Sequence, residues 1–302
     1  MKLNVYYDLK YAPATFDFST FLVLSNAVRQ TIGSESMSVN IICNQYRNWS
    51  VREKTTTASE KRWRVTNILS RLPFLIPEVS SLDINESSLE RISLPAFPGG
   101  YPPKDGAEYK MPYECSNLAS FYGNDSINLR PFKSTEGAKN IIDNSFDDNV
   151  ISISLRTSKF QTARNSNMKE WYKVYQELKS SKFRPIVIPD FEDYTGDKLY
   201  TKYDWEIYAP AVMDMDLRMA LYEKSTDNLC VNNGINGLLI FSDCRYNIFK
   251  YLNNEVSTVS EEFHLRIHGI RKGENYKFSA PTGQNLIWEA DSAEIILRTI
   301  KL

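Results

Sequence analysis

The sequence predicts an α/β protein of two domains, each built around a parallel sheet. Two strand–helix–strand units along the chain lead to this prediction, one within residues 3–43 and the other within residues 150–188. In both units a helix-like segment separates two short apolar runs. That order is typical of the crossover connection that joins neighbouring parallel strands.

The first unit begins with a strand over residues 3–7. Pro13 then breaks the chain, and residues 16–30 are expected to form an amphipathic helix that ends before Gly33. A second strand is predicted over residues 38–43. Together these elements predict a first pair of parallel strands with a helix on one face.

The second unit begins with a β-branched strand at residues 150–155, followed by a polar, basic loop. A helix is predicted from Met168 to Lys179, and a second apolar strand at residues 184–188. Ligands of open parallel sheets bind outside the carboxyl ends of the strands. The loop that follows residue 155 is therefore the first place to look for a binding site.

The domain boundary is expected near residue 145. The cluster Phe97-Pro-Gly-Gly-Tyr-Pro-Pro103 is the strongest structure-breaking signal in the chain. Few periodic signals follow it, so residues 94–149 are predicted to form a long irregular excursion that connects the domains. This gives a small first domain at residues 1–145 and a second at residues 146–302.

Composition excludes some classes of function. The formal net charge is −1, so the chain lacks the basic excess that bulk binding to nucleic acid requires. No apolar run approaches the roughly 20 residues of a membrane-spanning helix, and the first residues show no signal-peptide pattern. A soluble, cytoplasmic protein is expected, with a peripheral membrane contact left open.

The loop after the strand at residues 150–155 carries groups that suit a phosphate or diphosphate. These candidate donor-binding residues are Arg156, Ser158, Lys159, Arg164 and Asn165. The alternative is a solvated loop with surface ion pairs. An arginine directly after a buried strand is poorly placed for that alternative, which favours a binding role.

A second candidate segment follows the apolar residues at 228–231. It comprises Asn232, Asn233, Gly234, Asn236 and Gly237. Glycines after a strand allow the backbone to approach a ligand, and a following helix offers unpaired N–H groups to an anion. The alternative is a tight strand exit.

Carboxylates supply the remaining candidates. Asp190 follows the strand at residues 184–188 and could meet a ribose or sugar hydroxyl, although acidic loops also serve solubility alone. Asp8 ends the first predicted strand and Asp17 starts the first predicted helix, so both are candidates for a catalytic base. Capping is the alternative role of Asp8 and Asp17.

The chain has two histidines, His264 and His268. So few histidines disfavour a hydrolase that is built on a Ser-His pair. Their spacing of four could place both on one helix face, but no third ligand lies nearby in the sequence. No metal site is therefore expected.

Two of these segments resemble motifs of the GT-B glycosyltransferase superfamily. Ser152-Ile-Ser-Leu-Arg156 resembles the strand-plus-arginine motif of the fucosyltransferase-like branch, in which the arginine binds the donor diphosphate. Thr157 stands where that motif usually carries a second basic residue. Val231-Asn-Asn-Gly-Ile-Asn-Gly237 resembles the glycine-bearing nucleotide loop of the C-terminal half.

The chain as a whole also resembles uncharacterised bacterial proteins from surface-glycan gene neighbourhoods. The matching stretches include Lys61-Arg-Trp63 and the closing Gln284-Asn-Leu-Ile-Trp288-Glu289. The GT-B resemblance implies two Rossmann-like domains that face each other across a cleft. In such a pair the first domain holds the acceptor and the second holds the nucleotide-sugar.

The function implied by this resemblance is metal-independent glycosyl transfer. A sugar would move from a nucleotide-sugar to a glycan or lipid-linked acceptor in bacterial surface polysaccharide synthesis. No cofactor is expected beyond the nucleotide-diphosphate sugar that serves as substrate. Two alternatives remain open, a nucleotide-sugar epimerase on the same architecture and a non-catalytic nucleotide- or sugar-binding protein.

Overall fold

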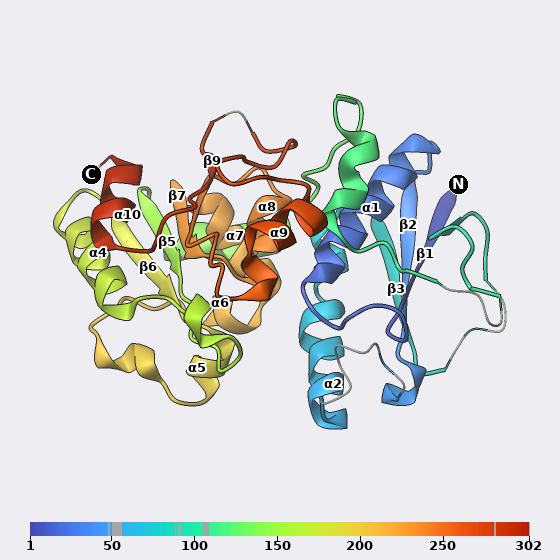
Figure 1. Ribbon diagram of the computed structural model, residues 1–302, viewed down its shortest axis with the longest axis horizontal. Coiled ribbons are helices and arrows are strands. Elements are labelled where there is room, and N and C mark those ends of the chain that lie inside the picture. The colour runs from blue at the N-terminus through green and yellow to red at the C-terminus, as the bar shows by residue number, and fades with distance from the viewer. Residues whose placement is uncertain are drawn as a thin grey trace. The chain divides into compact units, whose positions relative to one another are not determined.

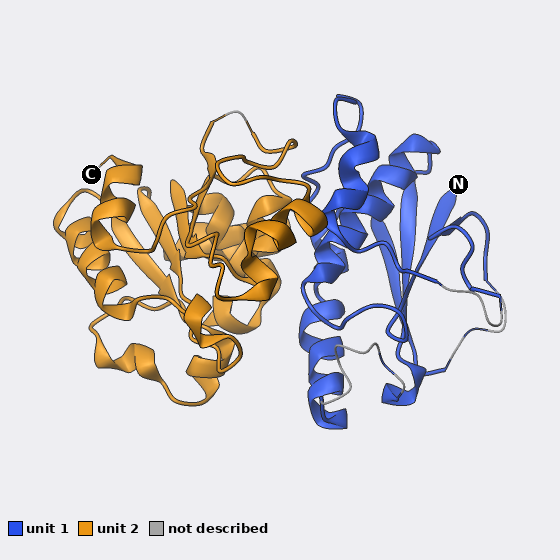
Figure 2. Cartoon of the chain, in the orientation of Figure 1, with its two compact units in different colours: residues 1–132 blue, residues 133–302 orange. Residues whose placement is uncertain are grey.

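The computed structural model describes residues 1–47, 49, 56–87, 89, 92–104, 109–280 and 282–301 (Figure 1). The chain divides into two compact units, residues 1–132 and residues 133–302 (Figure 2). Each unit contains one parallel sheet with helices packed on it, so the predicted α/β class is confirmed. Among the described residues, no helix combines the length and the apolar character needed to cross a membrane.

The first unit contains a four-stranded sheet in the order β3-β2-β1-β4. Its strands are β1 (Lys2–Asp8), β2 (Ser36–Ile42), β3 (Val79–Asn85) and β4 (Ala96–Phe97). Its α-helices are α1 (Asp17–Thr31) and α2 (Ala58–Arg64), the latter continued by a π-helical turn at Val65–Leu69. The predicted strand–helix–strand order at the start of the chain is therefore confirmed.

Aromatic packing fixes α1 against β1. The ring of Tyr7 lies 4.5 Å from that of Phe18 and 4.8 Å from that of Phe21, measured between centroids. All three side chains are fully buried. Side chains of alternate strand residues point to the same face, so Leu3 and Val5 join Tyr7 under the helix. This packing leaves Asp8 at the carboxyl end of β1.

The unit boundary lies after Phe132, whereas the sequence pattern predicted it after residue 145. The difference is due to helix α3 (Glu136–Ser145), which packs on α7 (Met215–Lys224) of the second unit. Thr135 caps α3 and donates to the Asp216 carboxylate, with an Oγ1–Oδ2 distance of 2.6 Å. The prediction of an irregular stretch over residues 94–149 was therefore wrong for residues 136–145.

The second unit contains a five-stranded parallel sheet in the order β6-β5-β7-β8-β9. Its strands are β5 (Val150–Ser154), β6 (Arg184–Ile188), β7 (Asp227–Val231), β8 (Tyr246–Phe249) and β9 (Gln284–Leu286). Its longer helices are α3, α4 (Met168–Ser180), α7 and α10 (Ala293–Ile300). Its short helices are α5 (Phe191–Thr195), α6 (Pro210–Met213), α8 (Gly237–Ile240) and α9 (Glu261–Phe263).

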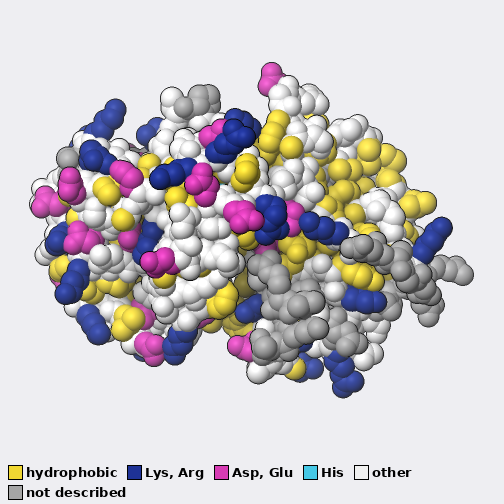
Figure 3. Space-filling view, in the orientation of Figure 1, with side chains coloured by type: hydrophobic (Ala, Val, Ile, Leu, Met, Phe, Trp, Pro, Cys, Tyr) yellow, Lys and Arg dark blue, Asp and Glu magenta, His cyan; other side chains and the backbone are white. Residues whose placement is uncertain are grey.

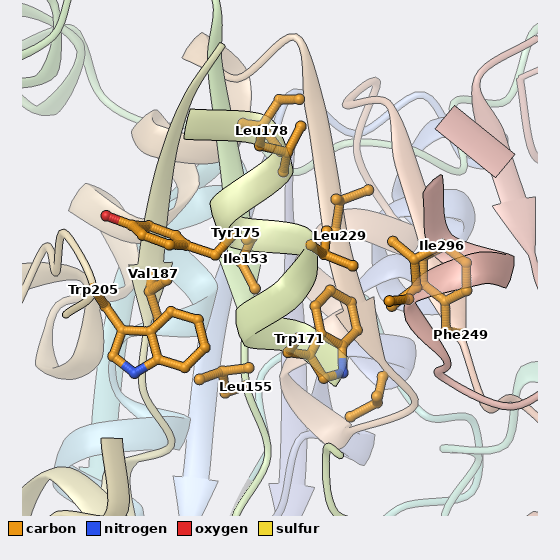
Figure 4. Packing of buried hydrophobic residues seen from close by; sticks show 14 of the residues in the cluster. Ile153, Leu155, Trp171, Tyr175, Leu178, Val187, Trp205, Leu229, Phe249 and Ile296 are labelled. Atoms are coloured by element: carbon orange, nitrogen blue, oxygen red, sulfur yellow. The ribbon is translucent and has the colours of Figure 1, made fainter. Parts of the chain in front are cut away.

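One face of this sheet packs an apolar core against α4 and α10 (Figure 4). Ile153 and Leu229 of the sheet meet Trp171 and Leu178 of α4, and Ile296 of α10 lies beside them. The side chains of Trp171 and Leu178 are fully buried. Truncating a buried tryptophan to alanine typically costs about 3–5 kcal/mol of stability. The packing of this core therefore holds β5 firmly against α4.

The opposite face of the sheet is also buried, and it mixes apolar side chains such as Ile186 and Ile248 with polar side chains that pair with one another. Ser152 of β5 donates to the side-chain oxygen of Asn228 on β7 at 2.5 Å, and Ser154 bonds the hydroxyl of Tyr222 on α7 at 2.8 Å. Figure 3 shows basic and acidic side chains interspersed over the second unit on the face in view. The mixture agrees with the near-zero formal charge.

Candidate functional site

Arg156 follows β5 at the carboxyl edge of the sheet and is only 3% exposed. Its guanidinium donates to the carbonyl oxygens of Phe160 at 2.6 Å and Gln161 at 3.2 Å, and to Asn165 Oδ1. Burial lowers the pKa of Arg156, while the charges of Asp190 and Glu192 act against that effect. The guanidinium therefore organises its own loop through neutral acceptors.

Arg164 lies in the same loop, and its guanidinium reaches the segment that follows β7. It donates to Gln161 Oε1 at 2.9 Å and to the Asn232 carbonyl at 3.3 Å, and it lies 3.5 Å from Thr258 Oγ1. Burial, together with the smaller effect of the Arg156 charge, lowers the pKa of Arg164 to about 10. The structure thus brings together the two segments that the sequence predicted to converge.

These two guanidinium groups have no ionic partner within the described part of the chain. Their Nε atoms are buried without hydrogen-bond partners, as are Thr157 Oγ1 and Asn236 Oδ1 at the same edge of the sheet. A buried charge is costly unless an opposite charge compensates it, and buried polar atoms are nearly always paired. The two Nε–H groups and the Thr157 hydroxyl can donate to an anion with several acceptor oxygens, whereas Asn236 Oδ1 only accepts hydrogen bonds.

Ser158 and Lys159 bind carboxylates of the same protein. The Ser158 hydroxyl and the Lys159 backbone N–H donate to Glu192 Oε2 at 3.1 and 2.9 Å. The exposed Lys159 ammonium lies 3.4 Å from the Asp197 carboxylate. These contacts match the alternative of a loop with surface ion pairs for Lys159.

Asp190 acts as the N-cap of α5 and also as a support for the loop. Its carboxylate accepts from the backbone N–H groups of Glu192 and Thr157, both at 3.2 Å. Burial raises the pKa of Asp190, although these hydrogen bonds and the charge of Arg156 oppose that rise. The contacts agree with capping, and contact with a ribose stays a prediction.

The segment after β7 is a compact strand exit. Asn233 Oδ1 accepts from the Gly234 N–H at 2.8 Å, and Asn236 donates to the Val231 carbonyl at 2.8 Å. Gly237 opens α8 with φ −52° and ψ −31°, which any residue can adopt. α8 has four residues, so it is too short to supply a helix N-terminal anion site.

Lys250 is a further cation at this edge that the sequence analysis missed. It follows β8, and its ammonium donates to the Asn165 carbonyl at 2.7 Å and lies 3.7 Å from the Asp291 carboxylate. Asp291 also accepts from the backbone of Asn167 at 2.7 Å and from the Trp171 indole at 2.9 Å. The available signal was a polar residue directly after an apolar strand, the same signal that identified Arg156.

In the first unit, Asp8 is 4% exposed and fully hydrogen-bonded. Its carboxylate accepts from the backbone of Lys10 at 2.8 Å, from Asn44 Nδ2 at 2.6 Å and from the Tyr101 hydroxyl at 3.0 Å. Burial raises the pKa of Tyr101, and the charge of Asp8 raises it further. The carboxylate is therefore held in one orientation at the end of β1.

Asn44 reaches Asp8 from an unusual turn. Asn44, Gln45 and Tyr46 have φ values of +46°, +51° and +59°, and left-handed residues other than glycine usually occur singly. Such strain persists only where the surroundings impose it, often at functional sites. Asp17, by contrast, opens α1 and accepts from the Thr15 hydroxyl at 2.9 Å, which agrees with a role at the helix start.

The two histidines belong to an aromatic cluster. The ring of His264 is fully buried, stacks on Tyr251 at 4.5 Å and bonds the Tyr251 carbonyl at 2.7 Å. His268 bonds the Tyr276 hydroxyl at 3.2 Å. Burial lowers the pKa of His264 to about 4. Among the described residues, no three His, Cys, Asp or Glu side chains are grouped so that they could hold a metal ion.

No protein-family model and no curated protein matches the sequence. The fold, however, matches solved structures. The ADP-heptose lipopolysaccharide heptosyltransferase II of Escherichia coli superposes with a TM-score of 0.51 at 10% identity, covering 100% of this chain and 98% of that enzyme. The chain has the GT-B fold. The prediction of two Rossmann-like α/β units is thereby confirmed.

Two further structures with this architecture give TM-scores of 0.46. They are the heptosyltransferase WaaC of Escherichia coli with ADP-2-deoxy-2-fluoro heptose and a glycosyl transferase family 9 protein from Veillonella parvula. Each is 10% identical to this chain. The WaaC match covers 100% of this chain and 99% of the other, and the Veillonella match covers 99% and 89%. In the GT-B fold found here, the second Rossmann-like unit carries the buried Arg156 and the half-buried Arg164.

Proposed function

We propose that this chain is a glycosyltransferase that moves a sugar from a nucleotide-sugar donor to a glycan or lipid-linked acceptor. The observation that carries the proposal is the pair of guanidinium groups at the carboxyl edge of the second sheet. Arg156 is buried and Arg164 is half-buried, and they are close enough for one charge to lower the pKa of the other. Within the described residues both are bonded only to neutral oxygens. The GT-B fold supports the same reading.

The proposed chemistry follows from the charge of the leaving group. When the glycosidic bond to a nucleoside diphosphate breaks, negative charge develops on the diphosphate oxygens. Arg156 and Arg164 would neutralise that charge, which is the main electrostatic requirement of the step. In this scheme Arg156 and Arg164 would take the role that a metal ion has in other transferases.

An inverting transfer also needs a base for the acceptor hydroxyl. Asp8 is the stronger candidate, because three hydrogen bonds hold its carboxylate in one orientation. Asp17 is the second candidate. The proposal includes a base role for Asp8 or Asp17 and membership of the fucosyltransferase-like branch. It also includes a cytoplasmic location and a bacterial surface polysaccharide as the product.

A nucleotide panel followed by product analysis tests this function. We expect one of UDP, GDP, ADP or CDP to raise the melting temperature of the protein, since a ligand that binds only the folded state stabilises it. The matching nucleotide-sugar should then release nucleoside diphosphate only when an acceptor is added. Conversion of the donor to an isomeric nucleotide-sugar without acceptor would identify an epimerase instead, and binding without turnover under any condition would indicate a binding protein.

A further inference from the structure

The loop between β5 and α4 carries an exposed aromatic ring at its tip. Phe160 is 67% exposed, although its backbone is fixed. Its carbonyl accepts from the Arg156 guanidinium at 2.6 Å, and its N–H donates to the Ser158 hydroxyl at 3.1 Å. An aromatic side chain held outside the core on an anchored backbone is available to a ligand.

The next residue, Gln161, is fixed as firmly. It adopts a left-handed backbone with φ +52°, and its carbonyl also accepts from Arg156 at 3.2 Å. Its side-chain oxygen accepts from Arg164 at 2.9 Å and from the Thr258 hydroxyl at 2.7 Å. Arg156 therefore holds the backbone that presents the Phe160 ring, and Arg164 holds the side chain of the next residue. A preorganised contact of this kind loses little entropy when a ligand binds.

We propose that the Phe160 ring is the stacking surface for the nucleobase of the donor. This inference rests on the proposed function and adds a residue that recognises the nucleoside. An anion bound by Arg156 lies next to the backbone of Phe160, because the same guanidinium bonds the Phe160 carbonyl. Every nucleobase offers a flat π-face to an aromatic ring. Phenylalanine has no hydrogen-bonding group for the hydroxyls of a sugar, whereas stacking on a nucleobase requires none.

Calorimetry on the full chain separates base stacking from phosphate binding. Wild type, Phe160→Ala and Phe160→Trp are titrated with UDP, GDP, ADP and CDP, and with inorganic pyrophosphate. For the nucleotide that binds best, we expect Phe160→Ala to weaken affinity by about 5-fold to 100-fold. Pyrophosphate affinity should stay within about twofold of wild type, and Phe160→Trp should retain nucleotide affinity. Phe74→Ala, which removes a 52% exposed ring from the first unit, is the matched control.

Three outcomes overturn the inference. Equal nucleotide affinity of wild type and Phe160→Ala would remove the ring from the nucleoside site and leave the proposed function intact. An equal loss of pyrophosphate affinity would show that the substitution damages the loop and that stacking is not the cause. Wild-type protein that binds neither pyrophosphate nor any of the four nucleotides would overturn both the inference and the proposed function.

Discussion

Replacing Arg164 with methionine separates a ligand-binding arginine from a structural one. Methionine keeps much of the apolar stem and removes the charge. The pKa of this arginine falls from 12.5 to about 10 in the folded protein, which corresponds to roughly 3 kcal/mol against the charged form. Because the folded pKa is the lower one, the cost is complete at neutral pH and is relieved only as pH rises from about 10 toward 12.5.

The hydrogen bonds of Arg164 to neutral oxygens offset part of this cost, each by about 0.5–1.5 kcal/mol. We therefore expect Arg164→Met to lose no more than about 1 kcal/mol of unfolding free energy without ligand. Breaking a buried ion pair would cost about 3–5 kcal/mol. Affinity for a nucleoside diphosphate should fall by about 1.5–3 kcal/mol, roughly tenfold to a hundredfold.

Urea denaturation of the ligand-free protein and calorimetry with the best nucleoside diphosphate measure the two quantities. Arg184→Met is the control, because Arg184 lies at the amino end of β6 and is paired with Glu206 at 2.6 Å. It changes the net charge equally and should leave affinity unchanged. A loss of 3 kcal/mol or more in stability for Arg164→Met, with unchanged affinity, would refute the reasoning and make Arg164 a structural residue.

The structure makes four further predictions, all measurable by urea denaturation. Burial keeps His264 neutral, with a pKa near 4 against 6.5 when unfolded, so its contribution to stability is lost as pH falls from 6.5 to 4, by up to about 1.4 kcal/mol per pH unit. Burial also lowers the pKa of His268, to about 3, so His264→Phe should reduce the slope of stability against pH between pH 7 and 4.5 without abolishing it. Gln45→Gly should raise the free energy of unfolding by about 0.5–1 kcal/mol, because glycine adopts the left-handed backbone of this residue without strain. Asn44→Ala should lower the free energy of unfolding by about 1.5–3 kcal/mol, because the buried Asp8 carboxylate loses a hydrogen bond. Asp291→Asn should also lower the free energy of unfolding by about 1.5–3 kcal/mol, because the Trp171 indole loses a charged acceptor. A decrease below about 0.5 kcal/mol would show that a neutral acceptor serves the indole equally well.

Local patterns were sufficient to predict three neighbouring strands of the second sheet, β6, β5 and β7, and to select the candidate site at their carboxyl ends. The β-branched run before Arg156 and the apolar run before Asn232 end at one edge because parallel strands share a direction. The contact between Arg164 and the Asn232 carbonyl follows from that geometry. Helix α3 was missed because its N-cap, Thr135, lies in a stretch with few other periodic signals.

The partners of the charged groups could not be predicted, because they depend on long-range contacts. Asp8 accepts from Asn44 and from Tyr101, which is 93 residues away in sequence. Lys250 reaches the loop of Arg156 through the Asn165 carbonyl, a contact that spans 85 residues. A sequence pattern identifies a charge at a strand end, but tertiary packing decides which atoms surround it.

Each unit has a buried charged side chain at the carboxyl end of its first strand. The shared position helps to indicate the role of these two charges. Asp8 ends β1 and Arg156 follows β5, and each of these strands is the first along the chain in the parallel sheet of its unit. Within the described residues, both charged groups are hydrogen-bonded by neutral partners, although the chain has 37 acidic and 36 basic side chains from which an ion pair could have formed. Stability alone would favour a counter-ion or an apolar residue at each position. Under the function proposed above, the Asp8 carboxylate would act on a hydroxyl proton and the Arg156 guanidinium on a phosphate.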